Sequence, residues 1–220
     1  MSEVSIETAR YNMVEQQVRP WDVLDDNVLN LLSDVPREEF APAGYQNAAF
    51  ADTCIPLAHD EVMMPPRLEG RLLQALAIQP TDTVLEIGTG SGFVTTLLAK
   101  QARFVYSVDI EQDFVDAASQ KLAADGTVNI KIEQGDASHG WSQHGPYDAI
   151  AVTGSMPVLP NELQESLKLG GRLFVIVGDS PVMEAKLITR LSQTEFRTDI
   201  LFETDLPALQ NCEQPNRFVL

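Results

Sequence analysis

Hydrophobic positions follow helical spacing in the first 80 residues of the chain. One apolar face comes after the acidic stretch Asp25-Asp26-Asn27 and ends at Pro36; it consists of Val28, Leu29, Leu31, Leu32 and Val35. A second helical face consists of Leu68, Leu72, Leu73, Leu76 and Ile78. Residues 36–66 between them are rich in proline and carry little periodicity, which predicts a loop with a short strand. We therefore expect a helical cap that carries a long loop.

From residue 81 onward, short apolar runs alternate with helical patterns. The expected strands are 83–87, 104–108, 130–133, 148–153 and 172–177, and the expected helices are 93–100, 112–124 and 161–168. This alternation predicts a mostly parallel sheet with helices on both faces, which is the doubly wound α/β class. After it, apolar residues alternate with polar ones over 183–191 and 196–202. That change of period predicts an antiparallel strand pair that closes the sheet.

These patterns divide the chain into two parts of one compact unit. We expect an N-terminal helical cap with the loop over residues 1–80 and an α/β core over residues 81–220. With 220 residues and 44% apolar content, the chain is long enough to bury a sizeable core. The tail from Leu206 to Leu220 is expected to be loop, with its apolar end at 218–220 docked on the core.

Charge and cysteine content exclude several classes of function. The 15 basic and 32 acidic side chains give a net charge of -17, which would repel a nucleic acid backbone. Cys54 and Cys212 have no neighbours at metal-ligand spacing, so neither a disulfide framework nor a metal site is expected. Residues 1–10 do not resemble a secretory signal, and no apolar run is long enough to span a membrane. We expect a soluble cytoplasmic protein, a monomer or a homodimer.

The glycine-rich stretch at residues 86–92 carries the strongest chemical signal. A strand runs directly into Gly88, Gly90 and Gly92 and then into a helix, which lets the backbone approach a ligand. A dinucleotide fingerprint would require glycine or alanine where Phe93 stands. Glu86 would repel a pyrophosphate but suits the amino group and sulfonium of S-adenosylmethionine. We therefore expect this cofactor on the loop, which also contains Thr89 and Ser91.

Further candidate cofactor contacts follow the next strands. Asp109 lies 21 residues after Gly88, where doubly wound sheets place an acid against ribose hydroxyls, and Ile110 follows it. Asp136, with Ala137 next to it, can accept a hydrogen bond from the exocyclic amine of adenine. Thr153 ends a strand at the edge where ligands bind in this fold. Singly, each acid has a structural explanation as a helix cap, but together they favour a nucleoside-containing cofactor.

Several stretches resemble the protein-L-isoaspartate O-methyltransferase family. They are residues 84–92, Gly135-Asp136 with Gly140-Trp141, 147–153, 170–173 with Val177-Gly178, and, further upstream, 12–19 and 35–42. The resemblance covers roughly residues 8–178. It implies transfer of a methyl group from S-adenosylmethionine to the α-carboxyl of isoaspartyl residues in damaged proteins, with S-adenosylhomocysteine as the product. It also implies cofactor contacts at Gly88, Gly90, Asp109 and Asp136.

The loop that would face the methyl acceptor departs from the family pattern. After Ile55-Pro56-Leu57 the family has Gly-Gln-Thr-Ile-Ser-Gln-Pro, with the serine regarded as an active-site residue. This chain reads His-Asp-Glu-Val-Met-Met-Pro at 59–65, so that Met63 replaces the serine. A carboxylate acceptor is ionised at neutral pH and needs no base, so losing the hydroxyl would loosen alignment rather than abolish transfer.

Other residues near this loop leave the acceptor open. Asp60 and Glu61 would repel an anionic acceptor and would suit an amine or hydroxyl, with either as general base. Alternatively, they face solvent and Met63 packs in a core. Ser155 could supply the missing hydroxyl. Three functions therefore remain: isoaspartyl methyl transfer to a protein or peptide, methyl transfer to a small-molecule, amine or hydroxyl acceptor, and non-catalytic binding of S-adenosylmethionine by a regulatory relative.

Overall fold

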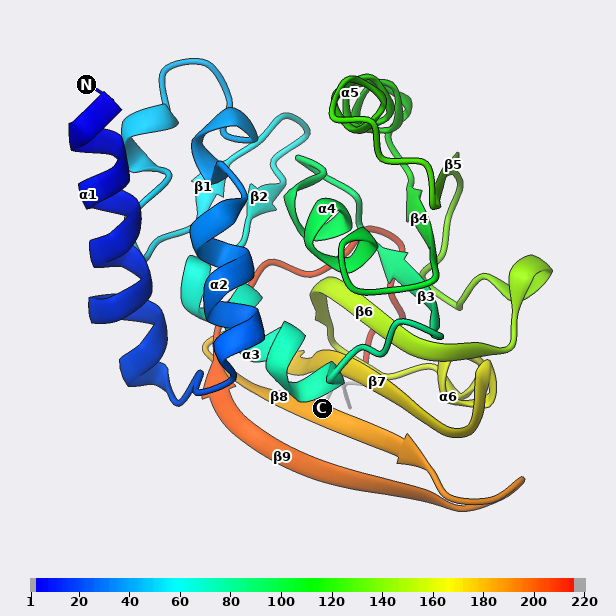
Figure 1. Ribbon diagram of the computed structural model, residues 1–220. Coiled ribbons are helices and arrows are strands. Elements are labelled where there is room, and N and C mark those ends of the chain that lie inside the picture. The colour runs from blue at the N-terminus through cyan, green and yellow to red at the C-terminus, as the bar shows by residue number, and fades with distance from the viewer. Residues whose placement is uncertain (1–2, 216–220) are drawn as a thin grey trace, which may run out of the picture.

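A seven-stranded sheet forms the centre of the computed structural model, which describes residues 3–215 (Figure 1). The strand order is β5-β4-β3-β6-β7-β8-β9. The strands are β3 (Thr83–Ile87), β4 (Phe104–Asp109), β5 (Ile130–Gln134), β6 (Tyr147–Met156), β7 (Leu167–Asp179), β8 (Val182–Arg190) and β9 (Phe196–Thr204). The strands from β5 to β7 pair in parallel, and β8 and β9 add antiparallel pairs. Both the parallel sheet and the antiparallel pair after it are confirmed.

Helices cover both faces of the sheet. Successive strand residues point to opposite faces, and the apolar side chains on each face need to be covered. On one face, Val84 and Phe174 join a core shared with α3 (Pro66–Leu76) and α4 (Phe93–Ala99). On the other face, Leu85 and Leu173 pack with Leu163 of α6 (Asn161–Glu165). Helix α5 (Gln112–Ala124) lies next to α4, since a Cβ at Gly92 would be 3.0 Å from the Ala118 Cβ.

The N-terminal cap packs on the first of these faces (Figure 1). It consists of α1 (Glu3–Met13), the π-helix η1 (Val14–Val18), α2 (Asp26–Asp34), the 3-10 helices η2 (Arg19–Trp21), η3 (Arg37–Glu39) and η4 (Gln46–Ala48), and the hairpin of β1 (Ile55–Pro56) and β2 (Val62–Met63). Asp25 accepts a hydrogen bond from the Asn27 amide and caps α2, as its position before the apolar face predicted. Within residues 3–215, no helix is long and apolar enough to cross a membrane. The apolar end of the tail at 218–220 lies outside the described residues.

The predicted helix at 161–168 is too long. It ends at Glu165, and β7 begins at Leu167 and passes through Gly170 and Gly171. Gly170 has a φ of +77°, and the pairing partner in β7 changes from Leu167 opposite Tyr147 to Arg172 opposite Ala149. The glycines therefore form a bulge within a strand instead of ending a helix, because sheet pairing outweighs the local helical pattern.

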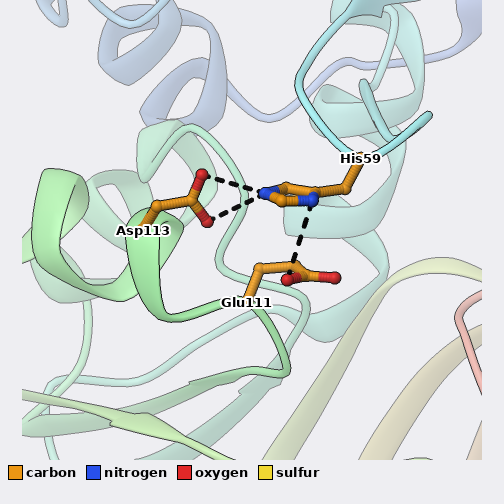
Figure 2. A group of neighbouring side chains, drawn as sticks. All are labelled: His59, Glu111 and Asp113. Carbon is orange, nitrogen blue, oxygen red and sulfur yellow. Dashed lines mark hydrogen bonds and ion pairs between the residues drawn. The ribbon is translucent and has the colours of Figure 1, made fainter.

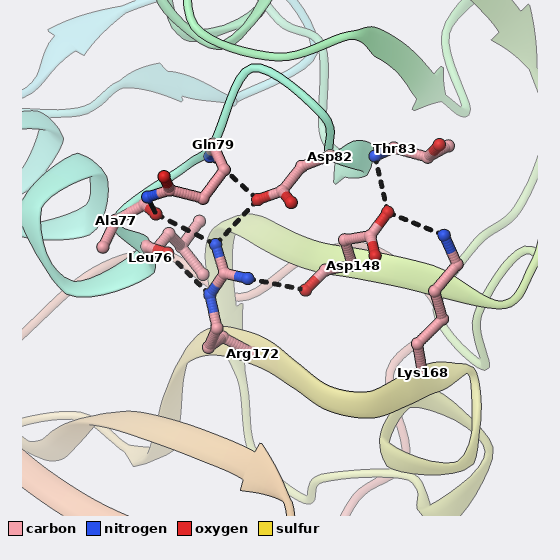
Figure 3. Close-up of polar contacts among 8 residues, drawn as sticks. All are labelled: Leu76, Ala77, Gln79, Asp82, Thr83, Asp148, Lys168 and Arg172. Atoms are coloured by element: carbon pink, nitrogen blue, oxygen red, sulfur yellow. Dashed lines mark hydrogen bonds and ion pairs between the residues drawn. The ribbon is translucent and has the colours of Figure 1, made fainter.

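Arg172 joins the sheet to helix α3 at the amino ends of the parallel strands (Figure 3). Its Nε donates to the carbonyl of Leu76 at 2.8 Å, and its Nη2 donates to Asp82 Oδ2 at 2.8 Å. Beside it, Asp148 accepts hydrogen bonds from the Thr83 amide and from Lys168 Nζ. These contacts join α3, β3, β6 and β7 at the amino ends of the parallel strands.

We expect Arg172→Ala to lower the free energy of unfolding by about 2 kcal/mol, because it leaves the Asp82 carboxylate and the Leu76 carbonyl without their charged donor. Chemical denaturation measures this change. The matched control is Arg197→Ala, which removes an exposed arginine of β9 from its ion pair with Asp199 and should change stability little. Equal losses in the two variants would contradict the structural role of Arg172.

Candidate cofactor and acceptor cleft

A cleft opens at the carboxyl ends of β3, β4, β5 and β6. It encloses about 860 Å³ of empty space, including its open mouth. The sheet side is formed by the loops after these strands. The opposite side, which we call the acceptor wall, is formed by Leu57 and residues 61–64 of the cap loop. Leu206, Pro207, Leu209 and Gln210 from the tail complete the lining of the cleft. The cleft thus brings together three segments that are far apart in the sequence.

The glycine loop lies on the sheet side of the cleft. Gly88, Gly90 and Gly92 all have positive φ, which other residues rarely adopt. A Cβ at Gly88 would be only 2.3 Å from Thr153 Oγ1, so no larger residue fits there. That Oγ1 lies 2.6 Å from the Gly88 carbonyl and 2.9 Å from the Ile87 carbonyl, and its single proton is donated to one of them. Thr153 therefore supports the loop and also lines the cleft. Thr89 and Ser91 line the cleft as well.

The two acids expected to hold a nucleoside both line the cleft. Asp109 accepts the Gly90 amide at 2.8 Å on one oxygen and the Glu111 amide at 3.0 Å on the other. Burial raises the pKa of Asp109, and these bonds oppose that shift. Asp136 accepts the Ser138 amide at 3.0 Å. Each carboxylate oxygen has a second lone pair, so both acids keep acceptor capacity for a ligand, and Ile110 and Ala137 lie beside them in the wall.

Glu86 does not line the cleft, which corrects the expectation that it faces the cofactor. Leu85 and Ile87 point to one face of the sheet, so Glu86 points to the other, where it is fully buried. Its Oε2 accepts bonds from Thr95 and Ser107, both at 2.5 Å, and Ser107 in turn contacts Thr89 at 2.6 Å. Burial raises the pKa of Glu86 to about 8, so it is mostly protonated at neutral pH. Through Ser107 and Thr89, Glu86 stabilises the glycine loop from the interior of the protein.

The acceptor wall contains Glu61 and Met63 but not Asp60. Met63 is 4% exposed and faces both the cleft and the core. Glu61 is half-buried, and burial together with the charges of Asp109 and Glu111 raises its pKa. Asp60 is exposed at the turn of the hairpin, with a φ of +60°, and lies outside the cleft lining.

His59, next to Asp60, links this turn to the start of α5 (Figure 2). Its Nε2 lies 2.9 Å from Asp113 Oδ2, and its Nδ1 lies 3.7 Å from Glu111 Oε2. The bond to Asp113 raises the pKa of His59, which favours the imidazolium form. The donor atoms of these three residues lie within 4.8 Å of one another, a spacing that could hold a metal ion. Because the carboxylates face different ring nitrogens, the arrangement matches an ion pair better than a metal site.

Ser155 does not offer its hydroxyl to the cleft. It is fully buried, and its Oγ donates to the carbonyl of Leu206 at 2.7 Å. Its backbone also bonds to the tail, since its amide donates to Pro207 and its carbonyl accepts from Leu209. Ser155 therefore anchors the tail, and the expectation that it replaces the missing hydroxyl is corrected.

A buried ion pair that was not predicted from the sequence lies beneath the acceptor wall. Arg37 and Glu69 are both fully buried, with Nε to Oε2 at 2.9 Å and Nη2 to Oε1 at 3.0 Å. Arg37 also donates to the carbonyls of Ala49 and Met64. A signal was present in the sequence, because Glu69 lies three and seven positions before Leu72 and Leu76 and so shares their buried face of α3.

The polar side chains that line the cleft suit a nucleoside joined to an amino acid better than they suit a phosphate. Among the described residues, no lysine or arginine lines the cleft, whereas Glu61, Asp109 and Asp136 do, along with Glu69, whose charge is paired with Arg37. Carboxylates accept bonds from hydroxyl and amino groups but repel phosphates. The apolar side chains of Ile110 and Phe114 lie in the same wall and suit an aromatic base. The preference for S-adenosylmethionine over a dinucleotide therefore rests on the first three of these acids instead of on Glu86.

Residues 9–208 match the family model described as protein-L-isoaspartate(D-aspartate) O-methyltransferase. A protein-L-isoaspartate O-methyltransferase of Rhodopseudomonas palustris is 36% identical over 202 residues, which cover 91% of this chain and 93% of the relative. Another, from a Synechococcus species, is 38% identical over 172 residues, or 78% of this chain and 70% of the relative.

The same fold occurs in a crystal structure from Plasmodium falciparum, described as a protein-L-isoaspartate O-methyltransferase in complex with S-adenosyl-L-homocysteine. It matches with a TM-score of 0.78 at 21% identity, over 91% of this chain and 98% of that one. The match therefore includes the cap as well as the sheet.

We expect the pH dependence of stability to reveal the buried Glu86. Its pKa is about 8 in the folded protein and near 4.5 in the unfolded chain, so between these values only the folded state keeps the proton. The contribution of Glu86 to stability is therefore greatest below about pH 4.5 and falls as the pH rises toward 8. Glu86→Gln should remove a slope of up to about 1.4 kcal/mol per pH unit, measured by urea denaturation from pH 5 to 8. Parallel pH profiles for the two proteins would refute this assignment.

We expect Glu69→Gln to lower the free energy of unfolding by about 3–5 kcal/mol, because it leaves the buried Arg37 charge without a partner. The double variant Arg37→Met/Glu69→Gln should lose less than the sum of the two single losses, measured by denaturation of all four proteins. Glu15→Gln, which breaks the exposed pair with Arg19, is the control and should change little. Additive losses at 37 and 69 would show that the two side chains do not act as a pair.

Proposed function

The chain belongs to the protein-L-isoaspartate(D-aspartate) O-methyltransferase family, and on that premise we propose that it transfers a methyl group from S-adenosylmethionine to the carboxyl of isoaspartyl residues in damaged proteins. The observation that supports this most is the arrangement of the cleft. The acceptor wall faces the glycine loop so closely that a Cβ at Gly90 would lie 3.3 Å from the Leu57 side chain. An acceptor placed between these walls would be next to the cofactor.

On the sheet side, each group has a role in holding the cofactor. Bound S-adenosylmethionine supplies a methyl group on a positively charged sulfur. The backbone from Gly88 to Ser91 would contact its amino acid part, Asp109 its ribose hydroxyls, and Asp136 the exocyclic amine of its adenine. Asp109 is preorganised for this role because two backbone amides already fix its carboxylate.

On the acceptor side, the residues would align the substrate and not activate it. A carboxylate acceptor is ionised at neutral pH, so no residue needs to remove a proton. Met63 supplies an apolar surface without a hydroxyl. Burial raises the pKa of Glu61, and the Gln210 amide donates to its Oε1 at 3.2 Å, so the repulsion between Glu61 and an acceptor carboxylate is reduced.

The same Glu61 also supports a second candidate function. As a half-buried carboxylate with a raised pKa, it could serve as general base for an amine or hydroxyl acceptor. The cytoplasmic location and the monomeric or homodimeric state stay predictions from the sequence.

The test is transfer of labelled methyl from S-adenosylmethionine to an isoaspartyl peptide, with the aspartyl peptide of the same sequence as control. We expect a base-labile methyl ester on the isoaspartyl peptide alone. Met63→Ser should raise kcat/KM by up to about tenfold, because a hydroxyl in the wall can bond to the acceptor. Ala58→Ser, which introduces the same group at an exposed position outside the cleft lining, is the matched control and should give no gain.

Transfer to neither peptide, by the native protein or by Met63→Ser, would refute the isoaspartyl proposal. Base-stable methylation of an amine or hydroxyl compound in the same assay would favour the second candidate.

A further inference from the structure

The tail that follows β9 returns to the sheet and crosses the mouth of the cleft. We call residues 206–211 the strap; they lie in the red segment of Figure 1. Ala208 forms a parallel bridge with Ser155 at the end of β6, and three hydrogen bonds of 2.7–3.0 Å join Ser155 to Leu206, Pro207 and Leu209. The strap is thus fixed at one end to the sheet, and not free in solvent.

The apolar part of the strap packs directly on the cofactor side of the cleft. A Cβ at Gly154 would lie 2.6 Å from Leu209 Cδ2, so Leu209 occupies space that only glycine leaves open. The same Cδ2 is 3.4 Å from the Cβ position of Gly88. Leu209 therefore sets the position of the next residue, Gln210, above the glycine loop.

Gln210 connects a carboxylate of the acceptor wall with one that lies beside the cofactor side of the cleft, directly after Asp109 and Ile110. Its Nε2 lies 3.2 Å from Glu61 Oε1 in the acceptor wall and 3.1 Å from Glu111 Oε1 before α5. An amide NH₂ group has two protons, so it can donate to both acceptors at once. Next to it, Asn211 Nδ2 donates to Asp136 Oδ2 at 2.8 Å. The two amide side chains thus contact carboxylates from three separate segments.

The charges around Gln210 explain why an uncharged donor matters here. Glu61 and Glu111 would repel each other without a donor between them, and Asp109 adds to that repulsion. His59 faces the other oxygen of Glu111, at 3.7 Å, and Asp113 lies on the far side of His59. Among the described residues, Gln210 is the one that hydrogen-bonds to the Glu61 carboxylate, so this bond is the main restraint on where the acid points.

We propose that Gln210 is a positioning residue for the methyl acceptor, because its single amide holds Glu61 of the acceptor wall against Glu111 beside the cofactor side. The reaction that this contact serves rests on the proposed function, but the contact itself concerns only residues of this chain. Without it, the acceptor wall would keep its fold through Arg37 but lose its restraint at the mouth of the cleft.

Hydrogen exchange tests the restraint without any turnover. The turn that carries Glu61 is closed by the Leu57 amide to the Glu61 carbonyl at 2.8 Å and by the Glu61 amide to the Ala58 carbonyl at 3.1 Å. In Gln210→Ala we expect these two amides to exchange about three- to tenfold faster, since one charge-assisted bond is lost. Gln193→Ala, in the exposed turn between β8 and β9, is the control and should leave them unchanged. Unchanged exchange in Gln210→Ala would overturn the proposal.

Kinetics test the effect on the acceptor. Gln210→Ala should raise KM for the isoaspartyl peptide about fivefold and change kcat less than about twofold, because the restraint acts on acceptor binding. Gln210→Glu places a third carboxylate beside Glu61 and Glu111, near Asp109, His59 and Asp113. Its KM relative to the native protein should rise a further threefold or so from pH 6 to pH 8.5 as the group loses its shared protons, whereas the ratio for Gln210→Ala stays flat.

Identical pH profiles for the two variants would overturn the role of Gln210 between the carboxylates. If the native protein does not methylate the isoaspartyl peptide, the proposed function fails, and the exchange experiment alone decides whether Gln210 positions the wall.

Discussion

The buried pair of Arg37 and Glu69 is the interaction on which the acceptor half of the cleft depends. Glu69 lies on α3, which packs against the sheet, while Arg37 lies in the cap and donates to the backbone at Ala49 and Met64. One guanidinium therefore joins the helix, the cap and the end of the acceptor wall. A charge so deeply buried is tolerated only with all its partners in place, so the wall has one well-defined position relative to the sheet.

The cofactor half is built differently, from contacts that are local to the ends of neighbouring parallel strands. The backbone amides of Gly90 and Glu111 fix the Asp109 carboxylate. Gly88 has room only for a hydrogen in place of a side chain, because Thr153 lies against it. Beneath them, the protonated Glu86 completes a chain of hydroxyl contacts through Ser107 to Thr89. The strap then links the two halves, since Ser155 holds it on the sheet and Gln210 reaches the acceptor wall.

This difference explains how much of the molecule could be predicted from the sequence. The alternation of strands and helices, the glycine loop, Asp109 and Asp136 were predictable because each depends on a short segment and on the common direction of parallel strands. Glu86 was misplaced because its strand is buried on both faces and shows no alternation of apolar and polar residues. The roles of Ser155, Gln210 and Arg37 depend on contacts between segments far apart in the chain, for which a sequence pattern carries no signal. Glu69 is the exception, since its helical spacing did indicate burial.

We infer that one cleft holds the cofactor on the sheet side and presents the acceptor from the cap side. The most direct measurement is a crystal structure of the protein with S-adenosylhomocysteine. We expect the ligand to lie against residues 88–91, with its ribose at Asp109, its adenine near Asp136 and its sulfur facing the wall that contains Glu61 and Met63. A ligand bound outside this cleft, or one whose sulfur faces away from that wall, would refute this arrangement.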